Sequence, residues 1–122
     1  MRVLLDNCVH YKAKSFFVGH EVLHARDVDW RKFTNGELLA QAAKTFDVLV
    51  TTDKKIRHEH NLERLPIPVL ELNTRFTRLA DLLTLSPYLE SALSLTSQFR
   101  FVSIGTGGVI ETLAERGAEK PG

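Results

Sequence analysis

The stretch that decides the fold is TNGELLAQAAKTFDVLVTTD, residues 34–53. Thr34 and Glu37 have the spacing of a capping box, in which a hydroxyl and a carboxylate accept hydrogen bonds from each other's backbone at a helix start. A β-branched run at residues 48–50 is typical of a parallel strand that is buried on both faces, and Asp53 follows it. The stretch predicts a helix, a tight connection, a buried strand and an acid at the strand's carboxyl end. The apolar residues that follow a helical period in this stretch are Leu38, Leu39, Ala42, Ala43 and Phe46.

The first residues of the chain show the same arrangement of a buried strand followed by an acid, in a shorter stretch. Residues 3–5, VLL, form another apolar run, and Asp6 follows it directly. The carboxyl ends of parallel strands meet at one edge of the sheet, and open α/β sheets place their sites at that edge. We therefore expect the carboxylates of Asp6 and Asp53 to lie at the same edge.

The rest of the chain alternates apolar runs with segments that have helical signals. This alternation predicts an α/β fold of three layers, α/β/α, around a mainly parallel sheet of four to five strands. The alternating run FRFVSI, residues 99–104, is typical of an edge strand. We expect one domain over residues 1–104 and a weakly structured tail over residues 105–122. The other expected elements are a helix over 8–17, a strand over 20–25, a charged loop over 26–33, a helical segment over 54–65, a strand over 69–72 and one or two helices between 79 and 93.

Composition favours an ordinary globular domain. The chain has 122 residues, of which 43% are hydrophobic and 25% are charged, and its formal net charge is +1. The near-neutral charge gives no strong electrostatic signal for nucleic acid. Cys8 is the only cysteine, so no internal disulfide can form, and a reduced cytoplasmic location is the simple interpretation. No apolar run approaches the ~20 residues that a membrane span needs.

Three acids are candidates for a metal site, namely Asp6, Glu37 and Asp53. Carboxylates and water are the ligands that Mg²⁺ and Mn²⁺ prefer, and a cluster of three carboxylates needs a cation because like charges repel. Each acid also has a simpler interpretation as a helix cap. The two interpretations are compatible, since all three caps face the same edge of the sheet. Asp27 and Asp29 are either a further ligand or solvated loop acids.

Several other side chains each allow two interpretations. The basic run that follows Asp53 is either an edge that binds phosphate or a solvated helix face. Trp30, with Arg31, either stacks on a base or seals the edge of the core. Cys8 is interpreted as a small buried hydrophobic residue. The leucine-rich stretch over residues 79–95 is either two core helices or a surface for a homodimer or a partner's helix. The basic run contains Lys54, Lys55, Arg57, His58 and His60.

Several short segments, taken in chain order, resemble motifs of the PIN-like nuclease superfamily, which includes VapC-type toxins. The resemblance is to its short, minimal bacterial branch, and it covers residues 1–93. The matching words are LLDNCV, DVDWRKFTNGELLAQA, DVLVTTDKKIRHEHNL, PIPVLELNTR and LADLLTLSPYL.

The resemblance implies a hydrolase that uses Mg²⁺ or Mn²⁺ to cleave phosphodiester bonds of single-stranded RNA, toxin-like and paired with a small antitoxin. By position, Asp6, Glu37 and Asp53 match the catalytic, metal-binding acids. Arg57 and Asn61 match polar positions that follow, and Lys54 or Arg57 would orient the phosphate. Two departures stand out: Asn7 occupies a position where many relatives have a second acid, and a fourth acid is not evident.

The alternative is a module that binds a protein partner and does not cleave RNA. It would be a degenerate PIN-like domain or a receiver-like domain, which also has acids after its first and third strands. Asp53 would be the phospho-acceptor of a receiver. Against a receiver, Asn7 replaces the second acid of the usual adjacent pair, and no lysine ends a late strand.

Overall fold

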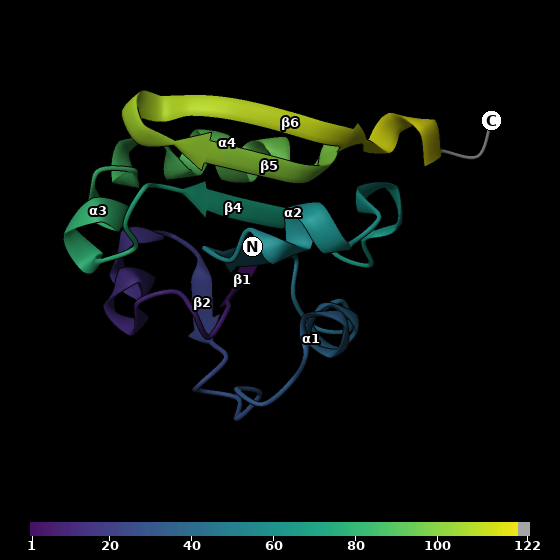
Figure 1. The fold of residues 1–122 in the computed structure, drawn as a ribbon, viewed down its shortest axis with the longest axis horizontal. Coiled ribbons are helices and arrows are strands. Elements are labelled where there is room, and N and C mark those ends of the chain that lie inside the picture. Colours follow the sequence, from purple (N-terminus) through teal and green to yellow (C-terminus); the bar gives the residue numbers. More distant parts are fainter. Residues whose placement is uncertain (120–122) are drawn as a thin grey trace.

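The computed structural model describes residues 1–119 and contains one sheet of six strands in the order β2-β1-β3-β4-β5-β6 (Figure 1). All neighbouring strands are parallel except β5 and β6, which are antiparallel. The predicted α/β class with a mainly parallel sheet is confirmed, with six strands in place of four to five. The strands are β1 (Arg2–Leu5), β2 (Glu21–His24), β3 (Val48–Thr51), β4 (Val69–Asn73), β5 (Phe99–Gly105) and β6 (Val109–Glu115).

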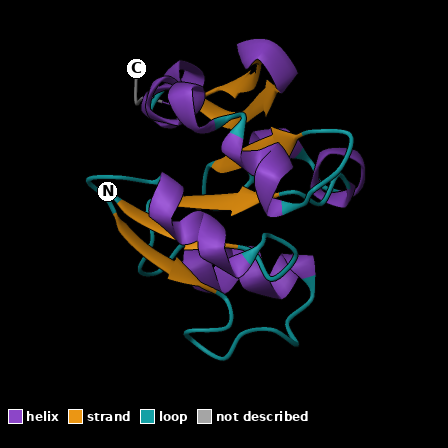
Figure 2. Ribbon diagram, turned by 90° about the vertical axis from the view of Figure 1, so that its left-hand side faces the viewer, coloured by secondary structure: helices purple, strands orange, loops and turns teal. Residues whose placement is uncertain are grey.

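Short helical segments connect the parallel strands and flank the sheet (Figure 2). The capping box is confirmed: the Thr34 N–H donates to Glu37 Oε1 at 2.8 Å, and the Glu37 N–H donates to Thr34 Oγ1 at 3.2 Å. The α-helices are α1 (Asn35–Ala42), α2 (Lys55–Glu59), α3 (Leu79–Leu83) and α4 (Leu89–Leu95), and the 3₁₀ segments are η1 (Tyr11–Phe16), η2 (Leu62–Arg64), η3 (Ser86–Tyr88), η4 (Thr106–Gly108) and η5 (Arg116–Glu119).

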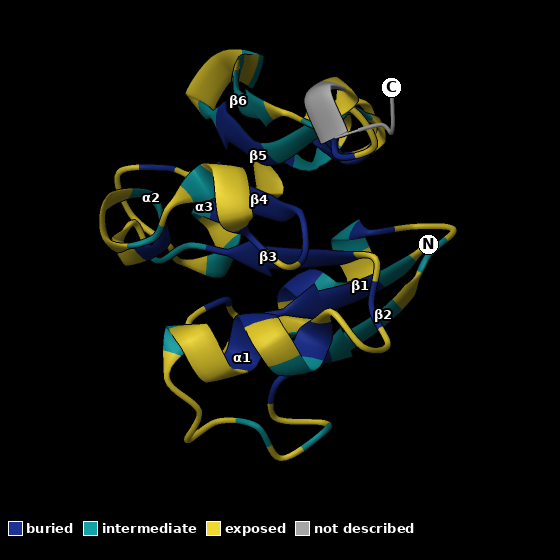
Figure 3. Ribbon diagram, turned by 90° about the vertical axis from the view of Figure 1, so that its right-hand side faces the viewer, coloured by how far each residue is buried: buried dark blue, intermediate teal, exposed yellow. Residues whose placement is uncertain are grey.

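The central strands are buried on both faces, as their continuous apolar runs predict. In β1, Val3 and Leu5 pack into a core with η1, α3 and α4, whereas Leu4 packs into a second core with α1 and α2. Figure 3 shows the strands of this region as buried and the outer side of α1 as exposed. Helices therefore cover both faces of the sheet, and the strand ends are left for the connecting loops.

The segment predicted as a weakly structured tail, residues 105–122, differs in its described part. Residues Val109–Glu115 form β6, which pairs with β5 from Phe99↔Glu115 to Gly105↔Val109. The strand at 99–104 is consequently an interior strand and not the predicted edge strand. The signal for this hairpin was the pair Gly107 and Gly108, which both have positive φ in the turn. Residues 120–122 of the predicted tail lie outside the described part.

The leucine-rich stretch supplies core residues, so the interpretation as core helices holds for most of it. Leu82, Leu85, Leu89 and Leu93 are buried, whereas Leu83 is 52% exposed. In the described part of the chain, none of the helices has the length and apolar character to cross a membrane.

Candidate functional site at the carboxyl edge of the sheet

The predicted site lies where the chain changes direction across the sheet. The connection after β1 leads to β2 on one side, and the connection after β3 leads to β4 on the other side. The two connections diverge at the carboxyl ends of β1 and β3, which is the position where doubly wound sheets bind ligands. Asp6 follows β1 directly, and Asp53 is the second residue after β3.

Thr51, the last residue of β3, joins the two acids. Its hydroxyl donates to Asp6 Oδ2 at 2.8 Å and accepts from the Asp53 N–H at 3.0 Å. Asp6 Oδ1 also accepts from the Asn7 N–H at 2.7 Å. Thr51 is fully buried and Asp6 is 6% exposed, so these bonds fix the orientation of the Asp6 carboxylate.

Asp53 faces the N-termini of two helices. Its Oδ1 accepts from the Lys55 N–H at 2.9 Å, and its Oδ2 lies 3.5 Å from Asn35 Nδ2. Asp53 thus accepts from the first N–H of α2, but the N-cap residue of that helix is Lys54 and not Asp53, which we had predicted. Asn35 is the first residue of α1, so the polar side chain that α1 brings to the site is an amide.

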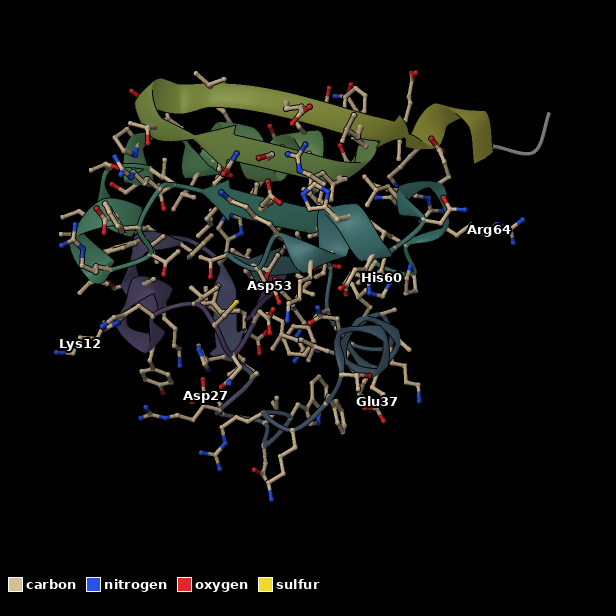
Figure 4. The ribbon with its side chains drawn as sticks, in the orientation of Figure 1. Lys12, Asp27, Glu37, Asp53, His60 and Arg64 are labelled. Atoms are coloured by element: carbon tan, nitrogen blue, oxygen red, sulfur yellow. The ribbon has the colours of Figure 1, made fainter. Side chains whose placement is uncertain are left out.

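The structure does not bring Glu37 into this group, in contrast to the prediction. The Glu37 carboxylate stays in the capping box, where the Thr34 N–H and then the Thr34 hydroxyl lower its pKa. Figure 4 shows Glu37 on a side of α1 that points away from Asp53. The reason is helical phase: two residues correspond to about 200° around a helix axis, so Asn35 and Glu37 face opposite directions.

Cys8 is part of the same corner and is not the buried hydrophobic residue that we predicted. It is exposed, and its Sγ lies 3.5 Å from Asp6 Oδ2 and 3.4 Å from Thr51 Oγ1. Desolvation of the thiolate, followed by the charge of Asp6, raises the pKa of the thiol. Cys8 therefore remains protonated at neutral pH and can donate a weak hydrogen bond to the acid.

A polar row extends from this corner across the sheet. Thr51 pairs in register with Glu71, Glu71 with Ser103, and Ser103 with Glu111. Neighbours in register point to the same face, so these side chains lie beside one another under α2. Glu71 is only 1% exposed, and it accepts from the Ser103 hydroxyl at 2.8 Å. The sheet thus changes from apolar to polar toward its carboxyl edge.

Arg57, predicted to bind phosphate, is held by this polar row instead. Its Nη2 lies 3.0 Å from Glu71 Oε1, its Nη1 lies 2.7 Å from Glu111 Oε1, and its Cζ lies 5.2 Å from the ring centroid of Phe101. The hydrogen bond to Glu71 is the main reason that the pKa of Arg57 is raised. The guanidinium is committed to an internal ion pair, because Glu71 is buried and needs a counter-charge.

The two other predicted substrate-binding residues are at the surface. Lys54 is exposed and adjoins Asp53 in the chain. Asn61 is exposed too, and its Oδ1 accepts from the Glu63 N–H at 3.1 Å, which makes it the cap of η2. Lys54 is therefore better placed than Asn61 or Arg57 for contact with a ligand at Asp53.

Sequence reasoning missed three members of this region, namely Thr51, Asn35 and Glu71. A signal existed for Glu71, since an acid inside the apolar run VLEL must be paired when the strand is buried. Thr51 could have been noticed as the polar residue directly before the strand end. Asn35 had no signal of its own, because only the packing of α1 decides which of its first residues faces the strand ends.

Asp6 and Asp53, which follow the ends of adjacent strands, have the chemistry for a cation with few protein ligands. Within residues 1–119 there is no group of three His, Cys, Asp or Glu side chains arranged to hold a metal ion. Mg²⁺ commonly uses one or two carboxylates and keeps several waters, and Asp6 with Asp53 offers that donor set. Comparisons of the chain with family models, with curated proteins and with solved structures give no match.

Proposed function

We propose that this chain is a PIN-like hydrolase that uses Mg²⁺ or Mn²⁺ to cleave phosphodiester bonds of single-stranded RNA, as the toxin-like partner of a small antitoxin. The observation that carries the proposal is the link through Thr51 between Asp6 and Asp53, at the point where the chain changes direction across the sheet. Carboxylates at this edge are suited to a hard divalent cation.

Each residue of the corner has a role in this proposal. Asp6 and Asp53 would hold the cation, which when bound supplies Lewis-acid stabilisation of the charge that develops on the phosphate. Thr51 orients the Asp6 carboxylate and holds the backbone N–H of Asp53, and the Asn35 amide hydrogen-bonds to the Asp53 carboxylate. Lys54 would contact a non-bridging phosphate oxygen as a point charge. Glu37 has no part in the reaction.

The proposal predicts opposite outcomes for the three acids. We expect Asp6→Asn and Asp53→Asn each to abolish Mn²⁺ binding in calorimetry and Mn²⁺-dependent cleavage of single-stranded RNA. The amide keeps the size of the side chain but loses the negative charge that attracts the cation. Glu37→Gln is the matched control: it removes the charge of the capping carboxylate, and it should leave Mn²⁺ affinity and cleavage unchanged.

Circular dichroism and urea unfolding would establish that all three variants are folded. Cleavage that survives in both Asp6→Asn and Asp53→Asn would refute the proposed site. Loss of Mn²⁺ binding in Glu37→Gln as large as that in Asp6→Asn would restore the three-acid cluster that the sequence predicted, and it would contradict the geometry described above.

A second candidate function is a module that binds a protein partner without cleaving RNA. It is favoured by the position of Glu37 outside the site and by the internal pairing of Arg57. A folded wild-type protein that neither binds Mn²⁺ nor cleaves RNA would support it. The strand order 2-1-3-4-5 also occurs in receiver domains, so a gain in mass at Asp53 after incubation with acetyl phosphate and Mg²⁺ would indicate a receiver-like module.

A further inference from the structure

The loop that follows β4 displays an aromatic ring between two cations. The loop has the sequence TRFTR over residues 74–78, and Phe76 at its centre is 53% exposed. Arg75 Cζ lies 5.2 Å from the Phe76 ring centroid, and Arg78 Cζ lies 5.1 Å from it. A single exposed apolar side chain is common, but a ring with two guanidinium groups against it presents both a stacking surface and positive charge.

The backbone of this loop is held in place. Thr74 is 6% exposed, and its hydroxyl donates to the Phe76 carbonyl at 2.5 Å. Asp81 accepts from the Arg78 N–H at 3.1 Å and from Arg78 Nε at 2.9 Å. Arg75 has no ion pair among residues 1–119. The ring is therefore presented on an ordered turn, and one of its two cations is not neutralised by an acid.

The loop is at the same edge of the sheet as the candidate site. β4 is the parallel neighbour of β3, with Thr51 opposite Glu71, and both strands end toward this edge. Figure 1 shows the arrow of β4 pointing toward the loop and α3. Asp53 and Phe76 thus follow the carboxyl ends of two adjacent strands.

The other aromatic residues near this edge are used within the protein. Trp30 stacks on Phe33 with ring centroids 5.9 Å apart and meets Phe46 edge-on at 6.0 Å, which confirms that it seals the core. Tyr11 donates its hydroxyl proton to Asp27 at 2.7 Å and packs on His24. Tyr11 also has two cations against its ring, Lys14 Nζ at 4.8 Å and Arg26 Cζ at 4.0 Å, but its hydroxyl and Lys14 are both bonded to Asp27. Phe76 differs from Trp30 and Tyr11 because it is more exposed.

We infer that Phe76, flanked by Arg75 and Arg78, is a platform on which a base of single-stranded RNA stacks while an adjoining phosphate meets Arg75. Proteins that bind single strands combine aromatic surfaces for bases with positive charge for the backbone. The inference rests on the proposed function and deepens it, since it assigns a binding position for a nucleotide next to the one that is cleaved.

The test measures RNA binding without cleavage. The affinity of full-length protein for a fluorescent single-stranded oligoribonucleotide would be measured by anisotropy in EDTA. We expect Phe76→Leu, which keeps an apolar side chain but removes the ring, to weaken binding on the order of five- to a hundredfold. Phe76→Trp should bind at least as tightly as wild type. Phe33→Leu is the matched control at another exposed phenylalanine and should bind as wild type does.

Two further measurements separate stacking from general attraction. An oligonucleotide of the same length with abasic sites should bind to wild type and Phe76→Leu equally, because phosphate contacts remain and no base is available. RNA should quench the fluorescence of Phe76→Trp more than that of wild type, whose only tryptophan is Trp30. Arg75→Gln should weaken binding and reduce its dependence on salt.

The inference is overturned if Phe76→Leu binds base-bearing RNA as wild type does, or loses equal affinity for the abasic strand. Binding to anionic lipid vesicles in place of RNA, lost in Phe76→Leu, would reassign the loop to a membrane surface and overturn it too. Asp53→Asn distinguishes this failure from failure of the proposed function, because that variant should lose cleavage but keep RNA binding in EDTA.

Discussion

Asp27 lies in the loop after β2, where its carboxylate accepts three hydrogen bonds. The donors are Lys14 Nζ at 2.7 Å, the Tyr11 hydroxyl at 2.7 Å and the His24 N–H at 2.8 Å. Desolvation alone would raise the pKa of Asp27, but the hydrogen bonds from Lys14, Tyr11 and His24 outweigh it and hold that pKa well below its usual range. Asp27 is an exposed loop residue, as one of its two interpretations predicts, and its hydrogen bonds connect η1 to β2.

The depressed pKa of Asp27 predicts how stability depends on pH. A carboxyl group with a lowered folded-state pKa stabilises the protein above its unfolded pKa of about 3.9 and loses that contribution as pH falls further. We expect Asp27→Asn to reduce the free energy of unfolding by about 1–2 kcal/mol at pH 7. Urea unfolding should show this difference unchanged down to about pH 5 and shrinking toward pH 2. A difference of constant size at pH 2 would contradict the assignment.

The hairpin between β5 and β6 depends on its two glycines in different ways. Gly107 has φ of 79° and Gly108 has φ of 83°, a region that costs L-residues energy. A Cβ at Gly107 would meet nothing within 4 Å, whereas a Cβ at Gly108 would lie 2.6 Å from Tyr88 Cε1. The turn therefore holds β6 against the sheet both by backbone conformation and by close contact with Tyr88.

These two positions form a matched pair for mutation. We expect Gly107→Ala to lower the free energy of unfolding by about 1–2 kcal/mol, from backbone strain alone. Gly108→Ala should cost about 1–3 kcal/mol more, because Tyr88 must also move. Urea unfolding of both variants, repeated in a Tyr88→Ala background, measures the two contributions. If the gap between the variants persists without the Tyr88 ring, the steric explanation is incorrect.

The polar row and α2 hold distant parts of the chain together. Arg57 comes from α2, Glu71 from β4 and Glu111 from β6, and their ion pairs connect these three elements. Removing one partner of a buried pair leaves an unpaired charge, which is more costly than having no pair at all. The same row adjoins Thr51, so its integrity supports the strand end that carries the candidate site.

This arrangement predicts that the effects of substitutions at Arg57 and Glu71 on the free energy of unfolding depend strongly on each other. We expect Arg57→Met to destabilise the protein by about 3–5 kcal/mol, because the Glu71 carboxylate stays buried without a cation. The double variant Arg57→Met/Glu71→Gln should recover more than half of that loss in urea unfolding. Glu111→Gln is the control: the Glu111 carboxylate is half exposed, so the loss should be below about 1 kcal/mol. Additive losses in the double variant would rule out a coupled pair.

Local signals predicted the elements around the central stretch well. The capping box of Thr34 and Glu37 fixed the start of α1, and the β-branched run fixed β3 with an acid behind it. The site was predicted in part: Asp6 and Asp53 share the edge, as two strands ending in acids require. The error with Glu37 arose because spacing in sequence defines a cap but not which side of the helix faces the sheet.

The sequence by itself determined most of the parallel core and the edge at which Asp6 and Asp53 lie, though not β6, because capping, apolar periodicity and strand direction are local properties. Only the tertiary structure decided which polar groups meet. The rotation of α1 placed Asn35 and not Glu37 toward Asp53, the strand register lined up Glu71 with Thr51, and the burial of Glu71 drew Arg57 inward. Each outcome depends on the packing of segments that are far apart in the chain. A buried charge needs a partner of opposite charge, but no local sequence pattern indicates which residue that partner is.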